Sequence, residues 1–167
     1  GGMRQRVCIA MALINNPELI IADEPTTALD VTVQAQILNI LNSLRKVRKL
    51  SILFISHDFG VISQLCDRVI VMYAGSIVEE GPVKNIMQQA AHPYTSELIK
   101  CVPQLGNKEH ALHSIPGNPP SLNQLPEGCA FANRCQYKQD QCLKGSVPVS
   151  SKDNRSYKCF YPVGGAA

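Results

Sequence analysis

Two short runs of apolar residues, each followed at once by polar residues, constrain the fold of this chain most. Leu19-Ile20-Ile21-Ala22 leads into Asp23-Glu24, and Ile52-Leu53-Phe54-Ile55 leads into Ser56-His57-Asp58. Short, continuous apolar runs without a polar alternation are typical of parallel strands that are buried on both faces. The two runs therefore predict buried strands of a parallel sheet.

The segments around these strands predict helices and one hairpin. Apolar residues recur at helical spacing before, between and after the strands. Asn15-Asn16-Pro17 ends the first helix, and Asp30 can cap the second. Arg68–Tyr73 and Ile77–Glu80, which flank Ala74-Gly75-Ser76, are typical of a hairpin. The alternation of helix and strand predicts an α/β fold with a mainly parallel sheet.

Charge, proline and cysteine divide the chain near residue 90, which predicts domains at 1–90 and 91–167. The whole net charge of +3 falls in the second part, as do four clustered cysteines. Five prolines between Pro103 and Pro126 predict an extended connector. With 45% hydrophobic and 17% charged residues, the composition excludes disorder over most of the length. No apolar run reaches the roughly 18 residues of a membrane span, and the weak charge gives no indication of nucleic-acid binding.

The polar residues after the two strands are the first candidates for a functional site, because open α/β sheets bind ligands at the carboxyl ends of their strands. Asp23 and Glu24 would be costly if buried without partners. A magnesium ion beside a polyphosphate would account for them, with Asp23 holding the hydrated metal and Glu24 orienting an attacking water. His57 could donate to a phosphate oxygen. Taken singly, an acidic pair in a loop and a histidine at a strand end are more often structural.

The order of the motifs along the chain favours the functional interpretation of these residues over the structural one. Gly1-Gly2-Met3-Arg4-Gln5-Arg6, Leu19–Glu24, Thr27-Ala28-Leu29-Asp30 and Ile55-Ser56-His57-Asp58 follow one another along the chain. In this order they resemble the end of the signature motif, the Walker B strand, the D-loop and the switch-histidine loop of ATP-binding-cassette (ABC) ATPases. The resemblance covers roughly residues 1–90 and implies the C-terminal half of a P-loop NTPase domain.

The resemblance implies a role for each matching residue. Asp23 would bind Mg²⁺ through water, Glu24 would be the general base, and His57 would contact the γ-phosphate of ATP. Gly1 and Gly2 would present a helix N-terminus to ATP held by the opposite subunit, since exposed backbone N–H groups and the helix dipole favour an anion there. Asp30 lies in a loop suited to a nucleotide edge or a subunit contact.

Several family features are missing from the 167 residues. No G-x-x-x-x-G-K-[ST] motif occurs, the glutamine loop is not found, and the leucine and serine that usually precede the two glycines are absent. We therefore expect the chain to be a piece of a longer protein, and expect it to hydrolyse no ATP by itself.

The second part carries a narrower resemblance. His92-Pro93-Tyr94-Thr95 and Ile115-Pro116-Gly117-Asn118-Pro119-Pro120 resemble the C-terminal region of oligopeptide and dipeptide permease ATPases. This implies a subunit that powers peptide import from the cytoplasmic face of a bacterial plasma membrane. Its implied partners are membrane permease subunits, a second and usually different ATPase and, indirectly, a peptide-binding protein, without nucleic acid. Two alternatives stay open: a soluble ABC ATPase that acts on DNA or ribosomes, and a metal-binding module on an ATPase remnant.

Four cysteines crowd the end of the chain with the spacing C-x5-C-x6-C-x16-C: Cys129, Cys135, Cys142 and Cys159. Disulfides are disfavoured in a cytosolic ATPase, and zinc modules usually bring closely spaced cysteine pairs. An iron–sulfur cluster takes four thiolates at varied spacing. The resembled subfamily is associated with a [4Fe–4S] cluster at such cysteines, which we expect here with Zn²⁺ as the alternative.

Further residues of the tail and the remaining cysteines complete the expectations. Neighbouring residues could hydrogen-bond to the sulfur ligands or offset their charge: Gly128, Arg134 and Lys138. The remaining three cysteines are predicted to be ordinary buried thiols: Cys8, Cys66 and Cys101.

Overall fold

The structure is a computed structural model that describes residues 1–102 and 113–165. It divides the chain into two compact units, Gly1–Leu65 and Cys66–Ala167. This division by spatial contacts differs from the division near residue 90 by motifs and composition, because the predicted hairpin belongs with the second unit. Pro103, the first of the five prolines, lies outside the described residues.

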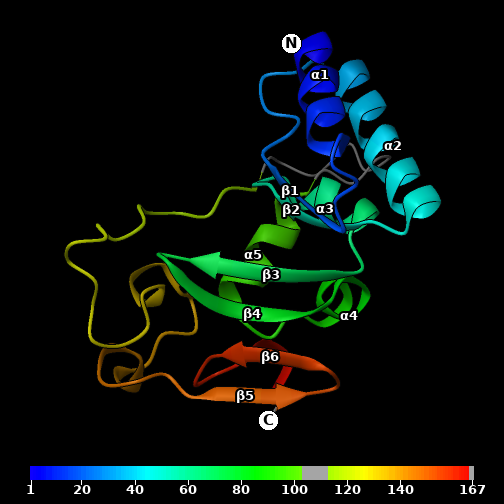
Figure 1. Cartoon of the computed structure of the whole chain (residues 1–167). Coiled ribbons are helices and arrows are strands. Elements are labelled where there is room, and N and C mark those ends of the chain that lie inside the picture. The colour runs from blue at the N-terminus through cyan, green and yellow to red at the C-terminus, as the bar shows by residue number, and fades with distance from the viewer. Residues whose placement is uncertain (103–112, 166–167) are drawn as a thin grey trace. The chain divides into compact units, whose positions relative to one another are not determined.

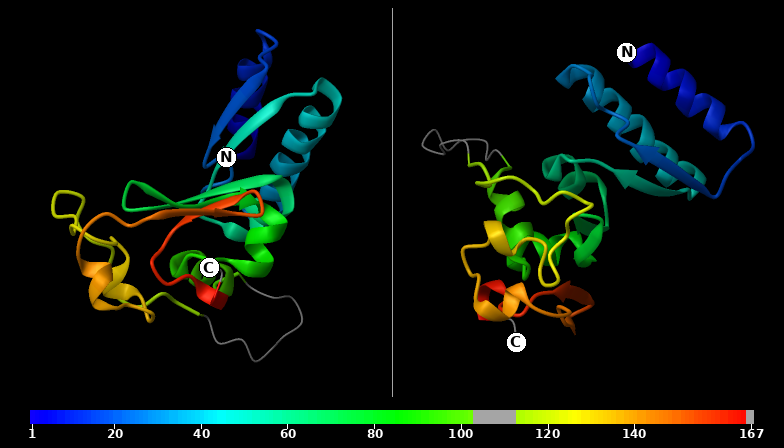
Figure 2. Two further views of the ribbon diagram at one scale, coloured as in Figure 1. Left: turned by 90° about the horizontal axis from the view of Figure 1, so that it is seen from below. Right: turned by 90° about the vertical axis from the view of Figure 1, so that its left-hand side faces the viewer.

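The first unit is built around a parallel strand pair with a helical crossover (Figure 1). β1 and β2 pair in parallel with Asp23 opposite Ile55, and α2 forms the connection between them. The helices and strands of this unit are α1 Gly2–Leu13, β1 Leu19–Asp23, α2 Val31–Arg48, β2 Ser51–Ile55 and α3 Phe59–Leu65. α1 and α2 lie side by side in both views (Figures 1 and 2). The predicted ends hold: α1 stops before Asn15, and the Asp30 carboxylate caps α2.

The strand pair is covered on one face only, which corrects the prediction of strands buried on both faces. Ile20, Ala22 and Phe54 are buried, and the fully buried α2 residues Ile37 and Leu41 belong to the same core. The opposite face of the pair carries exposed apolar side chains: Leu19, Ile21, Leu53 and Ile55. Since side chains alternate along a strand, a continuous apolar run places apolar residues on both faces whether or not both are covered.

The second unit contains a four-stranded sheet in the order β3-β4-β6-β5 (Figure 2). Every pair in it is antiparallel. The α-helices and strands of this unit are β3 Arg68–Tyr73, β4 Ser76–Pro82, α4 Val83–Gln89, α5 Pro93–Lys100, β5 Val149–Lys152 and β6 Arg155–Lys158. Three short 3₁₀ helices join them: η1 Ala132–Arg134, η2 Asp140–Leu143 and η3 Val163–Gly165.

The hairpin turns explain why the larger sheet is antiparallel and not mainly parallel. Ala74 and Gly75 connect β3 to β4 with φ values of 46° and 79°, and Asp153 and Asn154 connect β5 to β6 with φ values of 53° and 58°. Two residues at positive φ form the type of turn that matches the twist of antiparallel strands. Parallel neighbours need a connection of a dozen or more residues, which the segment with α2 provides between β1 and β2.

The second unit has an aromatic core that joins the hairpin to the C-terminal residues. The rings of Tyr73, Tyr94 and Phe131 contact one another with centroids 4.7–5.4 Å apart, and the His92 ring lies 5.9 Å from Phe131. Phe131 and His92 are each 1% exposed. β3, α5 and the cysteine-bearing segment therefore share one core. Within the described residues, no helix combines the length and the apolar character needed to cross a membrane.

Candidate functional site

The first candidate site lies where β1 and β2 end. The Glu24 N–H donates to the Ile55 carbonyl at 2.9 Å, so the strand pairing continues one step beyond Asp23. Glu24 and His57 consequently leave the same edge of the strand pair. The convergence of these two residues follows from the parallel register, since the carboxyl ends of parallel strands meet at one edge.

The two side chains are in direct contact. Glu24 Oε1 lies 3.1 Å from His57 Nδ1, and the Thr27 hydroxyl donates to Glu24 Oε2 at 2.8 Å. These hydrogen bonds, the one with His57 first and the one with Thr27 second, lower the pKa of the Glu24 carboxyl below its usual range. The Glu24 side chain is 45% exposed and that of His57 is 77% exposed. The pair is therefore ionisable and open to a ligand from solvent.

The backbone of this loop adopts conformations that non-glycine residues rarely take. Glu24 has φ 43° and Ala28 has φ 59°. The loop is held by hydrogen bonds from Thr27 N–H to the Glu24 carbonyl and from Leu29 N–H to the Thr26 carbonyl. Strained residues of this kind cluster at active sites, where the surrounding structure fixes the direction of a side chain. The hydrogen bonds of this loop thus hold Glu24 at its positive φ beside His57.

Gly1, Gly2 and Asp30 have local structural roles next to this loop. A Cβ at Gly1 would come within 2.7 Å of Leu29 Cδ2, and a Cβ at Gly2 would collide with Val33 Cγ1. The two glycines therefore allow the start of α1 to approach the start of α2. The Asp30 carboxylate accepts a hydrogen bond from the Val33 N–H at 2.9 Å, which is the N-cap that the sequence predicted.

A second candidate site lies in the cysteine-bearing segment. The four clustered cysteines line one pocket together with His92, Phe131 and Tyr137, among others: Cys129, Cys135, Cys142 and Cys159. The Cys129 N–H donates to the Cys142 carbonyl at 2.8 Å. Gly128 permits this approach, since a Cβ there would collide with the backbone of Cys142 and Leu143. Sequence positions that are 30 residues apart are thus brought to a common pocket.

The thiols of this pocket are in a low-polarity environment. Burial raises the pKa of the Cys129 and Cys135 thiols, and it raises that of Cys159 to about 12. The neighbouring cysteines raise the Cys159 value further. Across residues 1–102 and 113–165, no group of three or more His, Cys, Asp or Glu side chains is placed to hold a single metal ion. The predicted metal at the four cysteines therefore remains a prediction.

His92 and Glu79 are functional candidates that the sequence reasoning missed. Glu79 has no exposed surface, and its carboxylate accepts the N–H groups of Ala91 and His92 at 2.8 and 2.9 Å. His92 Nδ1 accepts the Tyr94 N–H at 3.0 Å and caps α5. Burial lowers the pKa of His92 to about 4. A histidine directly before proline at the start of a predicted helix is a signal for such a cap.

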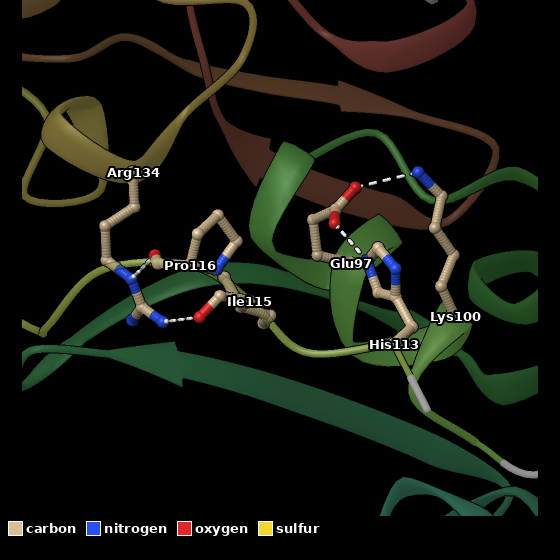
Figure 3. A network of polar contacts seen from close by, with 6 residues as sticks. All are labelled: Glu97, Lys100, His113, Ile115, Pro116 and Arg134. Atoms are coloured by element: carbon tan, nitrogen blue, oxygen red, sulfur yellow. Dashed lines mark hydrogen bonds and ion pairs between the residues drawn. The ribbon is translucent and has the colours of Figure 1, made fainter. Parts of the chain in front are cut away.

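The Arg134 guanidinium donates to oxygen atoms, whereas the sequence suggested that it could serve the sulfur ligands. Its Nε and Nη2 atoms donate to the Pro116 and Ile115 carbonyls at 2.9 Å each, and Nη1 donates to the Tyr73 hydroxyl at 3.3 Å. Figure 3 shows the two carbonyl contacts. Arg134 therefore fixes the Ile-Pro-Gly segment to the aromatic core.

A separate polar cluster lies near this segment. Glu97 on α5 pairs with Lys100 at 2.7 Å and with His113 at 2.6 Å (Figure 3).

Of the three scattered cysteines, Cys8 is exposed on α1, and Cys66 and Cys101 are partly buried. The prediction of a buried thiol is wrong for Cys8, because α1 has no buried residue in this structure.

The sequence of this chain matches two known protein families. The C-terminal region of oligopeptide/dipeptide transporters matches at residues 78–142, and the ABC transporter family matches at residues 1–27. The oligopeptide transport ATP-binding protein OppD of Salmonella typhimurium is 48% identical over 98% of this chain and 49% of its own length. The chain belongs to the oligopeptide/dipeptide branch of the ABC transporter ATP-binding proteins.

Other members of this ABC branch support the assignment. OppD of Haemophilus influenzae is 55% identical over 85% of this chain and 44% of its own length. The probable D,D-dipeptide transport ATP-binding protein DdpD of Escherichia coli is 48% identical over 97% of this chain and 50% of its own length. The chain thus spans about half the length of the curated relatives it matches.

The solved structure of MJ1267, an ATP-binding cassette of an ABC transporter, confirms the α/β fold class. It aligns with a TM-score of 0.50 and 29% sequence identity, over 59% of this chain and 39% of its own length. In the structure of the present chain, Glu24 and His57 are in contact, and the four clustered cysteines line one pocket. The catalytic and cofactor-binding roles of these residues remain proposals.

Proposed function

We propose that this chain is the part of an ATP-hydrolysing subunit that supplies the general base and the switch histidine, and that the subunit powers peptide import. The observation that carries the proposal is the contact between Glu24 and His57 at the carboxyl edge of β1 and β2. It combines a strained glutamate, an exposed imidazole and a hydroxyl from Thr27. The relatives named OppD are oligopeptide transport ATP-binding proteins, which supports ATP-dependent transport of oligopeptides.

Glu24 is suited to accept a proton from an attacking water. Hydrogen bonding holds its pKa low, so the carboxylate is ionised at neutral pH. Thr27 and His57 occupy one acceptor position on each carboxylate oxygen, and each oxygen keeps a further lone pair for water. As the water oxygen bonds to the γ-phosphorus, its proton passes to Glu24 and the bond to the ADP oxygen breaks.

His57 is suited to link the carboxylate to the nucleotide. When the His57 ring carries a proton on both nitrogens, Nδ1 donates to Glu24 Oε1 and Nε2–H, on the other side of the ring, donates to a γ-phosphate oxygen. Asp23, at the end of β1, is the residue that would hold Mg²⁺ through water. The metal would neutralise charge on the phosphates. The start of α1 at Gly1 and Gly2 would face ATP on a second subunit, with Asp30 beside it.

The proposed partners follow from the same branch of the family. Relatives are named as ATP-binding proteins of oligopeptide and dipeptide transport. We therefore propose a pair of ATPase subunits, different from each other, on membrane permease subunits, with a peptide-binding protein acting indirectly and no nucleic-acid partner. The protein would be peripheral on the cytoplasmic face of the bacterial plasma membrane.

For the cysteine pocket we propose a [4Fe–4S] cluster with a structural role. Four thiols line one pocket, and burial raises the pKa of the Cys129, Cys135 and Cys159 thiols, which disfavours their ionised forms in the absence of a cation. Zn²⁺, the alternative, needs four ligand atoms closed around a single point. A four-iron cluster instead binds one thiolate at each of four separate irons, so its ligands stand around a larger centre. The donor set fits such a cluster, which would supply the tail with a bound core.

Transport is the decisive test of the main proposal. The intact protein, reconstituted with its permease subunits in vesicles, should drive uptake of an oligopeptide that depends on ATP. The proposal would be overturned by a complex that takes up no peptide in the presence of ATP, or by an ATPase that co-purifies with ribosomes and without permease subunits. The 167-residue chain alone should show no turnover above a Glu24→Gln control.

Anaerobic purification of the intact protein tests the cofactor. We expect a brown protein with iron and acid-labile sulfide in equal amounts, and loss of both on Cys142→Ser substitution. A colourless protein with stoichiometric zinc would overturn the cluster proposal and support Zn²⁺ as the bound metal.

A further inference from the structure

His92 is placed at the four-cysteine pocket by contacts that the ATPase chemistry does not use. Its ring lines the pocket together with Cys129, Cys135, Cys142 and Cys159, and the residue is 1% exposed. The ring also lies 5.9 Å from that of Phe131, which lines the same pocket. A buried ring at a wall of thiols needs a hydrogen-bonding role for each of its two nitrogens.

One of these roles is fixed by the start of α5. His92 Nδ1 lies 3.0 Å from the Tyr94 backbone nitrogen. A backbone N–H can only donate, so Nδ1 must accept, and the proton of the neutral ring must be on Nε2. The two nitrogens lie on different edges of the ring. With Nδ1 turned to the α5 backbone, Nε2–H is the edge available to the pocket.

This tautomer excludes His92 as a metal ligand. A histidine that ligates through Nε2 normally donates from Nδ1 to a carboxylate, a carbonyl or water. Here Nδ1 already accepts a proton from an amide, so ligation through Nε2 would require a ring without either N–H proton. The ring can donate from Nε2, and it cannot coordinate.

The backbone that carries the ring is held on two sides. Glu79 accepts the N–H groups of both Ala91 and His92, and the Val163 N–H donates to the Ala91 carbonyl at 2.8 Å. Glu79 comes from β4, and Val163 follows Cys159 near the end of the chain. The ring is thus fixed between the sheet and the segment that carries the last cysteine.

We propose that His92 donates its Nε2–H to a sulfur atom in the four-cysteine pocket and so acts as a positioning and tuning residue for the group bound there. The proposal rests on the proposed [4Fe–4S] cluster for the identity of that group. A hydrogen bond to a cluster sulfur stabilises the reduced, more negative state. His92 therefore raises the reduction potential of the cluster.

Two substitutions remove the N–H in different ways. His92→Asn keeps an oxygen where Nδ1 caps α5 but does not reach the pocket, and His92→Phe fills the pocket but removes the cap. In the anaerobically purified intact protein, both should give a midpoint potential more negative than that of the parent by redox titration followed by EPR. Val147→Ala, which opens the same pocket without removing a donor, is the matched control.

The outcomes separate this proposal from the cluster proposal. A cluster that is present in all variants with an unchanged or raised potential in His92→Asn overturns the role of His92 and leaves the cluster intact. A protein without iron overturns the cluster proposal and, with it, the tuning role of His92.

Discussion

The chain contains two glutamate–histidine neighbourhoods built from the same residue types in opposite environments. In the first unit, Glu24 contacts the imidazole of His57 directly, and both side chains are exposed to solvent. In the second, Glu79 accepts the backbone N–H groups beside His92, and both residues are buried. The first glutamate can exchange protons with a ligand, whereas the second is committed to the backbone.

The difference shows that the environment of a residue, and not its type, decides whether it is open to a ligand or holds the fold together. Hydrogen bonds with His57 and Thr27 lower the pKa of the exposed Glu24 carboxyl, and the hydrogen bonds of its loop hold its backbone at positive φ. Burial keeps His92 neutral, and its Nδ1 accepts the Tyr94 N–H as the cap of α5. Each of the following predictions tests one side of this contrast.

The largest effect is expected for Glu24→Gln in the intact ATPase. If Glu24 is the general base, turnover should fall by about 10²–10⁴-fold, since a glutamine cannot take the proton from water. Thermal stability should stay nearly unchanged because the side chain is exposed. Phosphate release at saturating ATP measures the effect, and Glu18→Gln, an exposed carboxyl outside the site, is the control. Turnover equal to that of the control would contradict a catalytic role.

The buried counterpart should respond in stability instead. Glu79→Ala leaves two backbone N–H groups without acceptors and leaves Arg155, 4.0 Å away, with an unbalanced buried charge. We expect a loss of about 3 kcal/mol in the free energy of unfolding. Urea denaturation measures it. The adjacent Glu80→Ala removes only a partly buried contact with Ser156 and should cost about 1 kcal/mol or less. Equal losses would refute the special role of Glu79.

The pH dependence of stability tests the burial of His92. Its pKa is lowered from 6.5 to about 4 in the folded state, so the unfolded chain binds more protons between these values. Stability is therefore complete above the unfolded pKa and falls as the pH is lowered toward about 4. This group should contribute a loss of about 2 kcal/mol between about pH 8 and pH 5. Urea denaturation of the parent and of His92→Asn at a series of pH values isolates the contribution. If the free energy of unfolding depends on pH in the same way in both proteins, the ring is not buried in solution.

The exposed site was largely predictable from the sequence because its residues are close along two short motifs. Apolar strands ending in Asp23-Glu24 and in Ser56-His57 define both the fold class and the edge where these residues meet. Parallel pairing through a helical crossover then brings Glu24 to His57 without further information. What the motifs did not reveal is the contact with Thr27 and the positive φ at Glu24, which depend on the loop's own hydrogen bonds.

The buried site was predictable only in part because it is assembled from distant segments. The count of cysteines indicated a common site, and the structure brings the four to one pocket. Sequence reasoning did not identify Glu79, which lies on β4 and reaches a backbone turn 12 residues away. It also assigned Arg134 to sulfur, whereas the guanidinium binds carbonyls of the proline-rich segment. Unlike the local cap at Asp30, these hydrogen bonds join a side chain to backbone groups 12 or more residues away, so no local sequence pattern reveals them.

Asp30 gives the smallest effect and divides the two kinds of role most sharply. As the N-cap of α2 it accepts the Val33 N–H, so Asp30→Ala should cost about 1 kcal/mol of stability. Asp30→Asn keeps a cap acceptor and should leave stability within a few tenths of a kcal/mol. Denaturation and ATP turnover should be measured on both variants of the intact protein. If Asp30→Asn keeps full stability and full turnover, the residue is a cap alone. If it keeps stability and loses turnover, its charge also acts on a nucleotide or a second subunit, and the D-loop belongs with Glu24 on the chemical side of the contrast.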